Sequence, residues 1–457
     1  MRVHEQLPVL PKLRPALTLG LIGVTLAVVK TRGSVVREAF GVRTLQLTLL
    51  YFGWAALTLP FGVWPGGSLD MLKGALPAAG CALVVLLCRP TQQTVDRIQR
   101  GVVMAAVLVG ALALARNERE AGRLGTIGSL DANDLAAEVA FAIPFAIGLM
   151  RGRRAVPRLA LGAAIAFLLY VLLETGSRGG VVAVAVSTLV LALGQAGARR
   201  YAALALLMVG GATMTAIAPA EFRTRFIAAY QGTDYNATSQ FGREALWGRA
   251  FDYIRERPIT GLGMANFPTI EGLSCQARRR QGLHEGGCPW MTVHNSYLQA
   301  ASELGLPGGL LFVGFMASAL GGAWPLWRTR RGRAGPGHRP ELLATMVGFA
   351  VSAFFLSHAY SYILFGLASL VALARRAAAA PTSAVVPGAG VPGAGVPGAG
   401  TPGDSAPPPV RVRQRGGLRG VPRWEPAVAG PGGPWRAVAA GAPLRAGGAR
   451  GGRRAPV

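Results

Sequence analysis

Residues 158–195 have the sequence RLALGAAIAFLLYVLLETGSRGGVVAVAVSTLVLALGQ, and this stretch decides the fold. It holds two apolar runs, 158–173 and 179–195, which are separated by a short polar turn. Each run approaches the roughly 20 residues that an α-helix needs to cross about 30 Å of hydrocarbon. The stretch therefore predicts two membrane-spanning helices that are joined by a turn containing Arg178.

The same pattern recurs along most of the chain of 457 residues. Apolar residues make up 51% of it and charged residues only 15%, against about 25% in an ordinary soluble domain. These proportions exclude a single soluble globular domain and predict an all-α polytopic bundle of about 10 to 11 transmembrane helices. The candidate spans lie near 16–29, 42–59, 71–88, 101–115, 134–150, 158–173, 179–195, 201–218, 303–327, 341–356 and 358–374.

Basic residues set the predicted orientation of these spans. Most of them fall in alternate loops, at 30–43, 89–100, 151–158, 199–200, 328–339 and 375–376. The other short loops hold Lys73, Arg116, Arg119, Arg123 and Arg178. Because basic loops stay in the cytoplasm, the first set is predicted to be cytoplasmic. The long segment 219–302 then faces the outside of the cytoplasm.

The C-terminal region differs in composition from the rest, which divides the chain into a membrane domain, 1–376, and a tail, 377–457. The tail repeats VPGAG from Val386 and is rich in proline, glycine and arginine, so it cannot bury enough apolar surface to fold. We expect a disordered cytoplasmic extension that either contacts anionic lipid headgroups or has no specific partner. The net charge of +26 lies in this tail and between apolar blocks, so no nucleic-acid partner is expected.

The segment 219–302 is predicted to contain an amphipathic helix over FGREALWGRAFDYIRER, residues 241–257. Trp247, Phe251 and Ile254 recur at helical spacing, which predicts one apolar face and a helix lying at the membrane interface. A second helix is expected to begin near His294 and to lead into the next span. Cys275 and Cys288 in the same segment form either a disulfide or two free thiols.

Two arginines and a histidine on this side of the membrane are candidate site residues. Arg178 is flanked by glycines, which let a backbone approach a ligand closely; the structural alternative is an arginine that snorkels at the membrane edge. Arg243 lies at the start of the amphipathic helix; the structural alternative is a solvated surface charge. His294 titrates near neutrality, but a histidine at a helix start is often a capping residue.

Together these three side chains suit a lipid-linked pyrophosphate. Arginine grips phosphate oxygens bidentately, and fixed cations stabilise the charge that develops on a leaving pyrophosphate. A histidine can orient or deprotonate an acceptor hydroxyl. The sequence holds no DxD, HExxH or P-loop motif, so neither a metal ion nor a nucleotide cofactor is expected.

Several strings around these residues recur in one family. They are GSLDANDLAAEVAFAIPF at 128–145, TGSRGG at 175–180, R-x-x-x-W-x-x-A at 243–250, PITGLGMANF at 258–267 and HNSYLQAASELGLPGG at 294–309. In this order, around one long loop, they resemble the O-antigen ligase and O-antigen polymerase family of bacterial membrane proteins. The resemblance covers about residues 40–375.

The resemblance implies a fold of the GT-C type and a metal-independent, inverting glycosyltransferase in the bacterial inner membrane, with its site facing the periplasm. The implied donor is an undecaprenyl-pyrophosphate-linked glycan, and the acceptor is a glycan or a lipid. Arg178 and Arg243 would contact the pyrophosphate and His294 would serve the acceptor. Further residues that match the family's binding motif are Asn295, Tyr297 and Glu303, although a structural role suits Glu303 better.

The resemblance leaves open whether the chain is a ligase, which moves a finished polymer, or a polymerase, which extends it. A different class of protein, a transporter or flippase of lipid-linked saccharide, is the alternative. That class predicts internal repeats with helices broken at matching positions, and ionisable residues at mid-membrane. The sequence shows no clear repeat, and the centres of its spans are nearly free of charge.

Overall fold

The computed structural model describes residues 33–379, except 121, 126–130, 196, 283–286, 329–336 and most of 218–241, together with residues 25 and 29. These residues form helices, apart from loops and one short hairpin of β1 (Arg119–Glu120) and β2 (Arg123–Leu124). Two predictions fall outside this part of the chain. They are the span near 16–29, apart from two of its residues, and the tail beyond residue 379.

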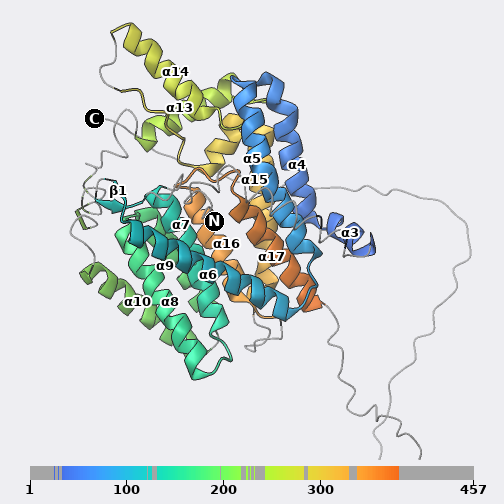
Figure 1. The fold of residues 1–457 in the computed structure, drawn as a ribbon, viewed down its shortest axis with the longest axis vertical. Helices are drawn as coiled ribbons and strands as arrows, with labels where there is room; N and C mark the ends of the chain where they lie inside the picture. Colours follow the sequence, from blue (N-terminus) through green and yellow to red (C-terminus); the bar gives the residue numbers. More distant parts are fainter. Residues whose placement is uncertain are drawn as a thin grey trace, which may run out of the picture. The chain divides into compact units, whose positions relative to one another are not determined.

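Each predicted span from 42–59 onward is matched by a helix (Figure 1). These helices are α4 (Arg43–Thr58), α5 (Pro65–Leu87), α6 (Gln92–Arg116), α7 (Ala132–Leu149), α8 (Ala155–Glu174), α9 (Arg178–Leu193), α10 (Ala198–Ile217), α15 (Ser296–Trp327), α16 (Pro340–Ala353) and α17 (Tyr362–Ala379). The short helix α3 (Gly33–Phe40) precedes them, and the 3-10 turn η2 (Leu59–Phe61) extends α4. Within the described ranges, 7 helical segments are long and apolar enough to cross a membrane, while α9 and α16 are shorter apolar helices. The predicted all-α polytopic fold is confirmed.

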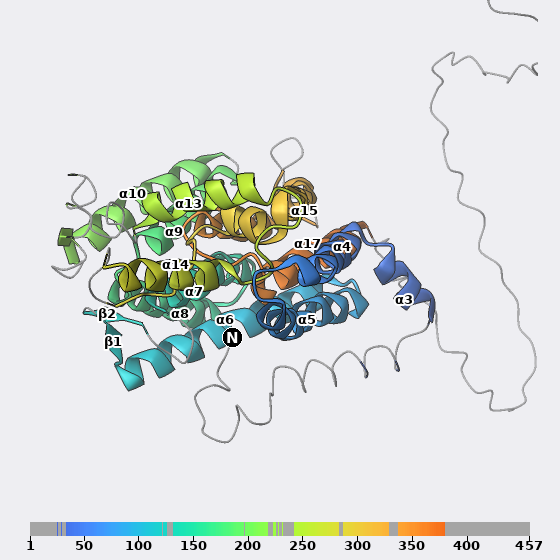
Figure 2. The same cartoon turned by 90° about the horizontal axis from the view of Figure 1, so that it is seen from above.

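Helix α7 forms the centre of the bundle. Nearly all of its residues are buried, and it packs against α6, α8, α9 and α16. On one side of the bundle lie α8, α9 and α10, and on the other α4, α5 and α17 (Figure 2). Small residues permit this close packing: a Cβ on Gly180 of α9 would lie 2.8 Å from the Cβ of Ala136 in α7.

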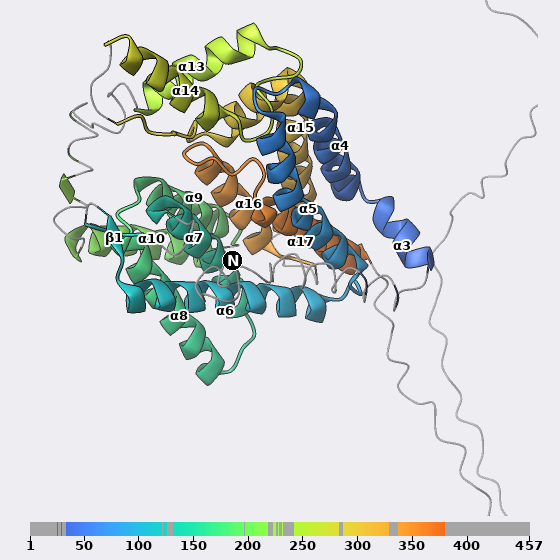
Figure 3. The same ribbon diagram turned by 45° about the horizontal axis from the view of Figure 1, so that its top comes forward.

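Charged side chains gather at one end of the bundle, where Arg151 lies 3.3 Å from Glu341 and Arg339 pairs with Asp96. We call it the charged end. The residues come from loops that the arginine pattern assigned to a single side. The opposite end, which we call the cap end, holds α13 (Arg243–Glu256) and α14 (Phe267–Arg280) (Figure 3). The alternation of loops is therefore as predicted, while the compartment that each end faces stays a prediction.

The cap has a small core of its own, formed by Leu246, Ala250, Leu262, Phe267 and Val293. The predicted amphipathic helix is present as α13, but its buried face differs from the predicted one. Phe251 is 51% exposed, whereas the neighbouring Ala250 is fully buried. The pattern of large apolar residues missed this face, because a small residue fills it where α13 packs closely. Helix α14 was not predicted, since the sequence before it is rich in turn-forming residues.

Two of the quoted sequence strings pack against each other under the cap. The carboxylate of Glu303 is buried and accepts hydrogen bonds from the backbone N–H groups of Ala265 and Phe267, at 2.9 and 3.2 Å. Gly305 has φ +71°, which breaks the helical path of α15, and a side chain there would strike the carbonyl of Ile259. The loop before α14 is therefore fixed on the first turns of α15.

Cys275 of α14 and Cys288 form a disulfide, with their Cα atoms 5.5 Å apart. The sequence alone left this pairing open. Disulfides persist in oxidising compartments, so the bond agrees with the predicted location of the segment 219–302 outside the cytoplasm.

We expect intact protein that is denatured without reductant to incorporate an alkylating reagent at Cys81 and Cys88, which are free cysteines, and not at Cys275 or Cys288. Replacing Cys275 and Cys288 with serine should destabilise the cap by about 3 kcal/mol, which is the effect expected for closing a loop of about 15 residues. Peptide mass analysis checks the first result, and denaturant titration the second, with Cys88→Ser as the control. Alkylation of Cys275 before reduction would contradict the disulfide.

Candidate functional site

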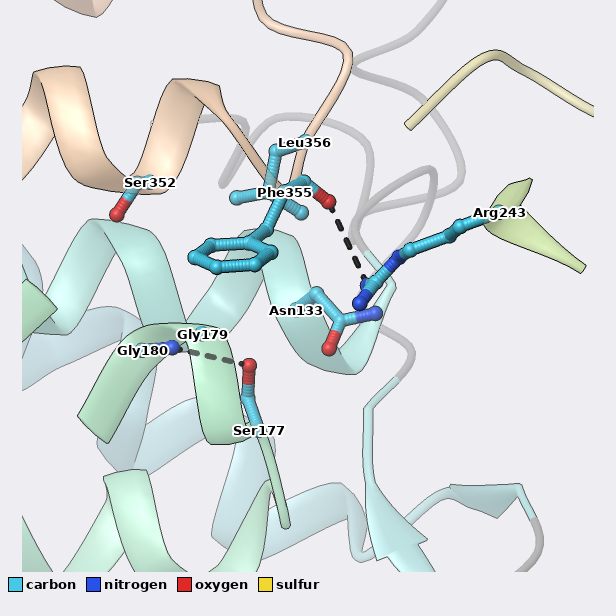
Figure 4. Close-up of a pocket in the computed structure, with 8 residues that line it drawn as sticks. All are labelled: Asn133, Ser177, Gly179, Gly180, Arg243, Ser352, Phe355 and Leu356. Carbon is cyan, nitrogen blue, oxygen red and sulfur yellow. Dashed lines mark hydrogen bonds between the residues drawn. The ribbon is translucent and has the colours of Figure 1, made fainter. Parts of the chain in front are cut away.

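A small pocket opens at the cap end, where α7, α9, α13 and the loop after α16 converge (Figure 4). Its volume is about 10 Å³, which is room for about one water molecule, and it is lined by Asn133, Ser177, Gly179, Gly180, Arg243, Ser352, Phe355 and Leu356. Pockets for whole small-molecule ligands measure about 300–1,000 Å³. This pocket can therefore receive one small polar group, such as a single phosphate oxygen, and not a complete lipid-linked glycan.

Arg243 contributes the cationic wall of the pocket. It is the first residue of α13, and its side chain extends to the loop between α16 and α17 (Figure 4). Its Nη2 donates to the carbonyl of Phe355 at 3.5 Å, and its guanidinium carbon lies 5.7 Å from the centre of the Phe355 ring. The ring and the carbonyl both favour a cation at this position. Arg243 is therefore positioned by contacts from a distant part of the chain.

Trp247, one turn further along α13, fixes this helix on its neighbours. Its indole N–H donates to the carbonyl of Val293 at 3.0 Å, and its ring meets that of Phe354 edge to face, with 5.2 Å between centroids. The side of α13 that carries Arg243 is thus hydrogen-bonded to Val293, the residue before His294.

His294 occupies a left-handed backbone conformation, with φ +50°, which is unfavourable for a residue other than glycine. Its backbone N–H donates to the hydroxyl of Ser357 at 2.9 Å. Burial and then the cation of Arg243 lower the pKa of His294, while Asp131 and Asp134 act in the opposite direction. The imidazole is therefore neutral near pH 7 and able to accept a proton.

Arg178 begins α9, and its neighbours Ser177 and Gly179 line the pocket. Its half-buried side chain is not among the pocket-lining groups. The flanking glycines serve close packing here, because a Cβ on Gly179 would lie 3.3 Å from the Cβ of Phe355. Arg178, Arg243 and His294 all lie at the cap end, although only Arg243 lines the pocket.

The three remaining candidates make contacts within the protein. Asn295 caps α15 by accepting from the N–H groups of Tyr297 and Leu298, and the hydroxyl of Tyr297 donates to the carbonyl of Ala350 at 3.1 Å. Glu303 also accepts from the hydroxyl of Tyr360 at 2.8 Å. Among the described residues that line the pocket, none of the three candidates appears. Their roles in binding a substrate stay predictions.

The string at 128–145 resembles the family's asparagine-bearing entry to a span, and the structure adds the partners of this asparagine, Asn133. Asn133 lines the pocket from α7, and Arg123 of β2 donates to its Oδ1 at 2.6 Å. The next residue in the chain, Asp134, lies 2.7 Å from Nε2 of His358. The string GSLDAND at 128–134 signalled polar residues at a span start, but partners as distant as His358 are set by tertiary packing.

Residues 139–313 match the O-Antigen ligase family. Over these residues the chain is similar to the O-antigen ligase family. This region contains Arg178, Arg243 and His294, together with α13, α14 and the first part of α15. The resemblance inferred from the sequence motifs is thereby confirmed. No curated protein matches the chain.

The match to the O-antigen ligase family, together with the apolar helices, indicates a multi-pass membrane protein with a membrane glycan function of the O-antigen ligase type. The family suggests an enzyme of the glycosyltransferase kind that acts on lipid-linked glycan among membrane lipids. In the part of the chain that the structure describes, no group of three or more His, Cys, Asp and Glu side chains is arranged to hold a metal ion.

Proposed function

We propose that the protein is an inverting, metal-independent glycosyltransferase. It transfers a glycan from an undecaprenyl-pyrophosphate donor to an acceptor hydroxyl at the extracytoplasmic face of a bacterial inner membrane. The observation that carries this proposal is the position of Arg243, which lines a small pocket at the cap end, where Arg178 and His294 also lie. A cation and a neutral imidazole are the groups that such a transfer requires at its two ends.

The proposed reaction is a single displacement at the anomeric carbon of the donor sugar. The acceptor hydroxyl oxygen forms the new bond to this carbon while His294 takes the hydroxyl proton. The bond from the same carbon to the pyrophosphate oxygen breaks, and its electron pair stays on the pyrophosphate. Arg243, with Arg178 at the start of α9, stabilises the charge that develops there. Attack opposite the leaving group inverts the anomeric centre.

Deleting the gene and analysing the surface glycan tests the proposal. A ligase predicts that the acceptor loses all polymer while long lipid-linked chains accumulate. A polymerase predicts one repeat unit on the acceptor. Complementation with wild type should restore the glycan, whereas Arg178→Ala should not, although this variant should still insert into the membrane.

Two other outcomes would contradict transfer as the function. Unchanged surface glycan in the deletion strain would exclude a role in assembling it. Accumulation of short lipid-linked saccharide on the cytoplasmic face would indicate a flippase, because a transferase acts after the donor has crossed the membrane. Binding of a lectin to the lipid-linked sugar in oriented vesicles, before and after the vesicles are opened with detergent, separates the two faces.

A further inference from the structure

The amide of Asn133 lies between Arg123 and the pocket. Its Oδ1 accepts from Nη2 of Arg123 at 2.6 Å. A guanidinium carries N–H donors and no acceptor, so the oxygen of the amide must face Arg123. The NH2 group then faces away from Arg123, and Figure 4 shows it on the side of Arg243. The orientation of this amide is therefore fixed by chemistry.

Arg123 is itself held in place by the turn between α8 and α9. Its Nε donates to the carbonyl of Thr175 at 2.9 Å. At the other strand of the hairpin, Arg119 pairs with Glu174 at the end of α8, at 2.6 Å. Gly176, with φ +59°, packs beside the aliphatic part of Arg123. The hairpin thus fixes Arg123 against the same turn that carries Ser177 and Arg178.

The walls of the pocket present N–H and O–H groups from three helices. Asn133 contributes its NH2 group from α7 and Arg243 its guanidinium from α13. The Ser177 oxygen accepts from the N–H of Gly180 at 3.3 Å, so its own proton can be donated into the pocket. Phosphate oxygens are acceptors that suit such a set of donors.

The carboxylates next to Asn133 are directed elsewhere. Asp131 caps α7 by accepting from the backbone N–H groups of Asn133 and Asp134, at 2.7 and 2.8 Å. Asp134 lies against His358. Both acids therefore serve the start of α7 and its neighbour, and they leave the amide of Asn133 as the group that α7 offers to the pocket.

We propose that Asn133 binds a phosphate oxygen of the donor's pyrophosphate through its NH2 group, and that Arg123 is the positioning residue that orients this amide. The inference rests on the proposed function, because the pyrophosphate is taken from it. It assigns to the site two residues that precede the family-matched region and come from another segment of the chain.

The substitution Asn133→Asp separates this proposal from a purely structural role. An aspartate keeps the acceptor for Arg123 and strengthens that contact, so a structural role would be preserved. It replaces the NH2 donor with an oxygen and adds a negative charge where the phosphate would bind. We expect binding to weaken by about 10- to 100-fold, while Asn133→Ala should show a smaller loss.

The measurements use full-length protein in lipid nanodiscs. Undecaprenyl pyrophosphate is the binding probe, inorganic pyrophosphate and undecaprenol are competitors, and transfer is followed with the lipid-linked glycan. The matched control is Asn117→Asp, because Asn117 also accepts from an arginine, Arg119, at 2.8 Å and lies exposed outside the pocket. This control should bind like wild type. Competition by inorganic pyrophosphate indicates that the site recognises the headgroup, whereas competition by undecaprenol alone would contradict phosphate binding.

The role of Arg123 is tested by a double-mutant cycle. Arg123→Ala should raise the KM for the donor with little change in kcat. Combined with Asn133→Ala, it should add no further loss, because it acts through that amide. Additive losses would overturn the positioning role.

The outcomes distinguish this inference from the function on which it rests. If wild type binds and transfers, and Asn133→Asp does so equally well, the assignment of Asn133 is wrong and the proposed function stands. If wild type neither binds undecaprenyl pyrophosphate nor transfers glycan, both the assignment of Asn133 and the proposed function are wrong.

Discussion

Replacing Arg243 with alanine is expected to lower the rate of glycan transfer by about 100- to 1,000-fold. Arg243 lines the pocket and is directed there by the carbonyl and the ring of Phe355. Its charge would contribute most in the transition state, when the pyrophosphate leaves. Arg243→Lys should recover only part of the activity, since an ammonium cannot make the bidentate contact. The measurement is transfer by purified protein in nanodiscs.

The matched control for this prediction is Arg255→Ala. Arg255 lies on the same helix, is exposed, and pairs with Asp252 at 3.1 Å. It has the same charge as Arg243, but it lies in the last turn of α13 and is not among the pocket-lining residues. We expect it to retain wild-type transfer. Equal activity of Arg243→Ala and Arg255→Ala would remove Arg243 from the site.

The sequence predicted the helical bundle well because hydropathy is a local property. The predicted span 158–173 became α8 (Ala155–Glu174) and 179–195 became α9 (Arg178–Leu193). The errors lie at the ends, where helices extend into polar residues that hydropathy does not register. Helix α6 begins at Gln92, well before the apolar run at 101, because Thr91 caps it by accepting from the N–H of Thr94.

The geometry of the site was less accessible from the sequence. The predicted spans 341–356 and 358–374 left almost no room between them, yet α16 ends at Ala353 and α17 begins at Tyr362. The apolar residues Phe354, Phe355 and Leu356 hid this loop inside a hydrophobic run. Its backbone and its Ser357 hydroxyl hold Arg243 and His294. Such contacts join residues far apart in the chain, so no local pattern reports them.

The sequence motifs therefore have two kinds of role, one in packing and one in the pocket region. The string around Glu303 and the string around Gly261 pack against each other and fix the cap on α15. The strings that hold Arg178 and Arg243 supply charge to the pocket region. A family motif can therefore contain residues that pack two segments together as well as residues that act on a substrate. The contacts in the structure distinguish the two kinds of residue.

The expected pH dependence of transfer follows from the surroundings of His294. Its pKa lies below the usual value of about 6.5, because of burial and then of Arg243, against the opposing effects of Asp131 and Asp134. The imidazole must be neutral to accept the acceptor's proton, so kcat/KM should rise as the pH increases through this lowered pKa and then level off. Arg243→Gln removes one cause of the lowered pKa and should move the midpoint of the remaining activity to higher pH.

His294→Gln should lower transfer by about 100- to 10,000-fold. The activity that remains should no longer fall at low pH, which means that the acid limb of the pH profile is lost.

His338→Gln is the control that separates this effect from general titration of histidine. His338 lies just before α16, near the charged end, and its pKa is also lowered, by burial and then by Arg151. It shares the direction of the shift with His294 but lies at the other end of the bundle, so its replacement should leave the acid limb in place. A profile that is flat in wild type, or that loses its acid limb in His338→Gln, would show that His294 is not the base. If His294 instead only oriented the acceptor, His294→Asn would retain substantial transfer with a flat profile, and the role of the imidazole would be positional.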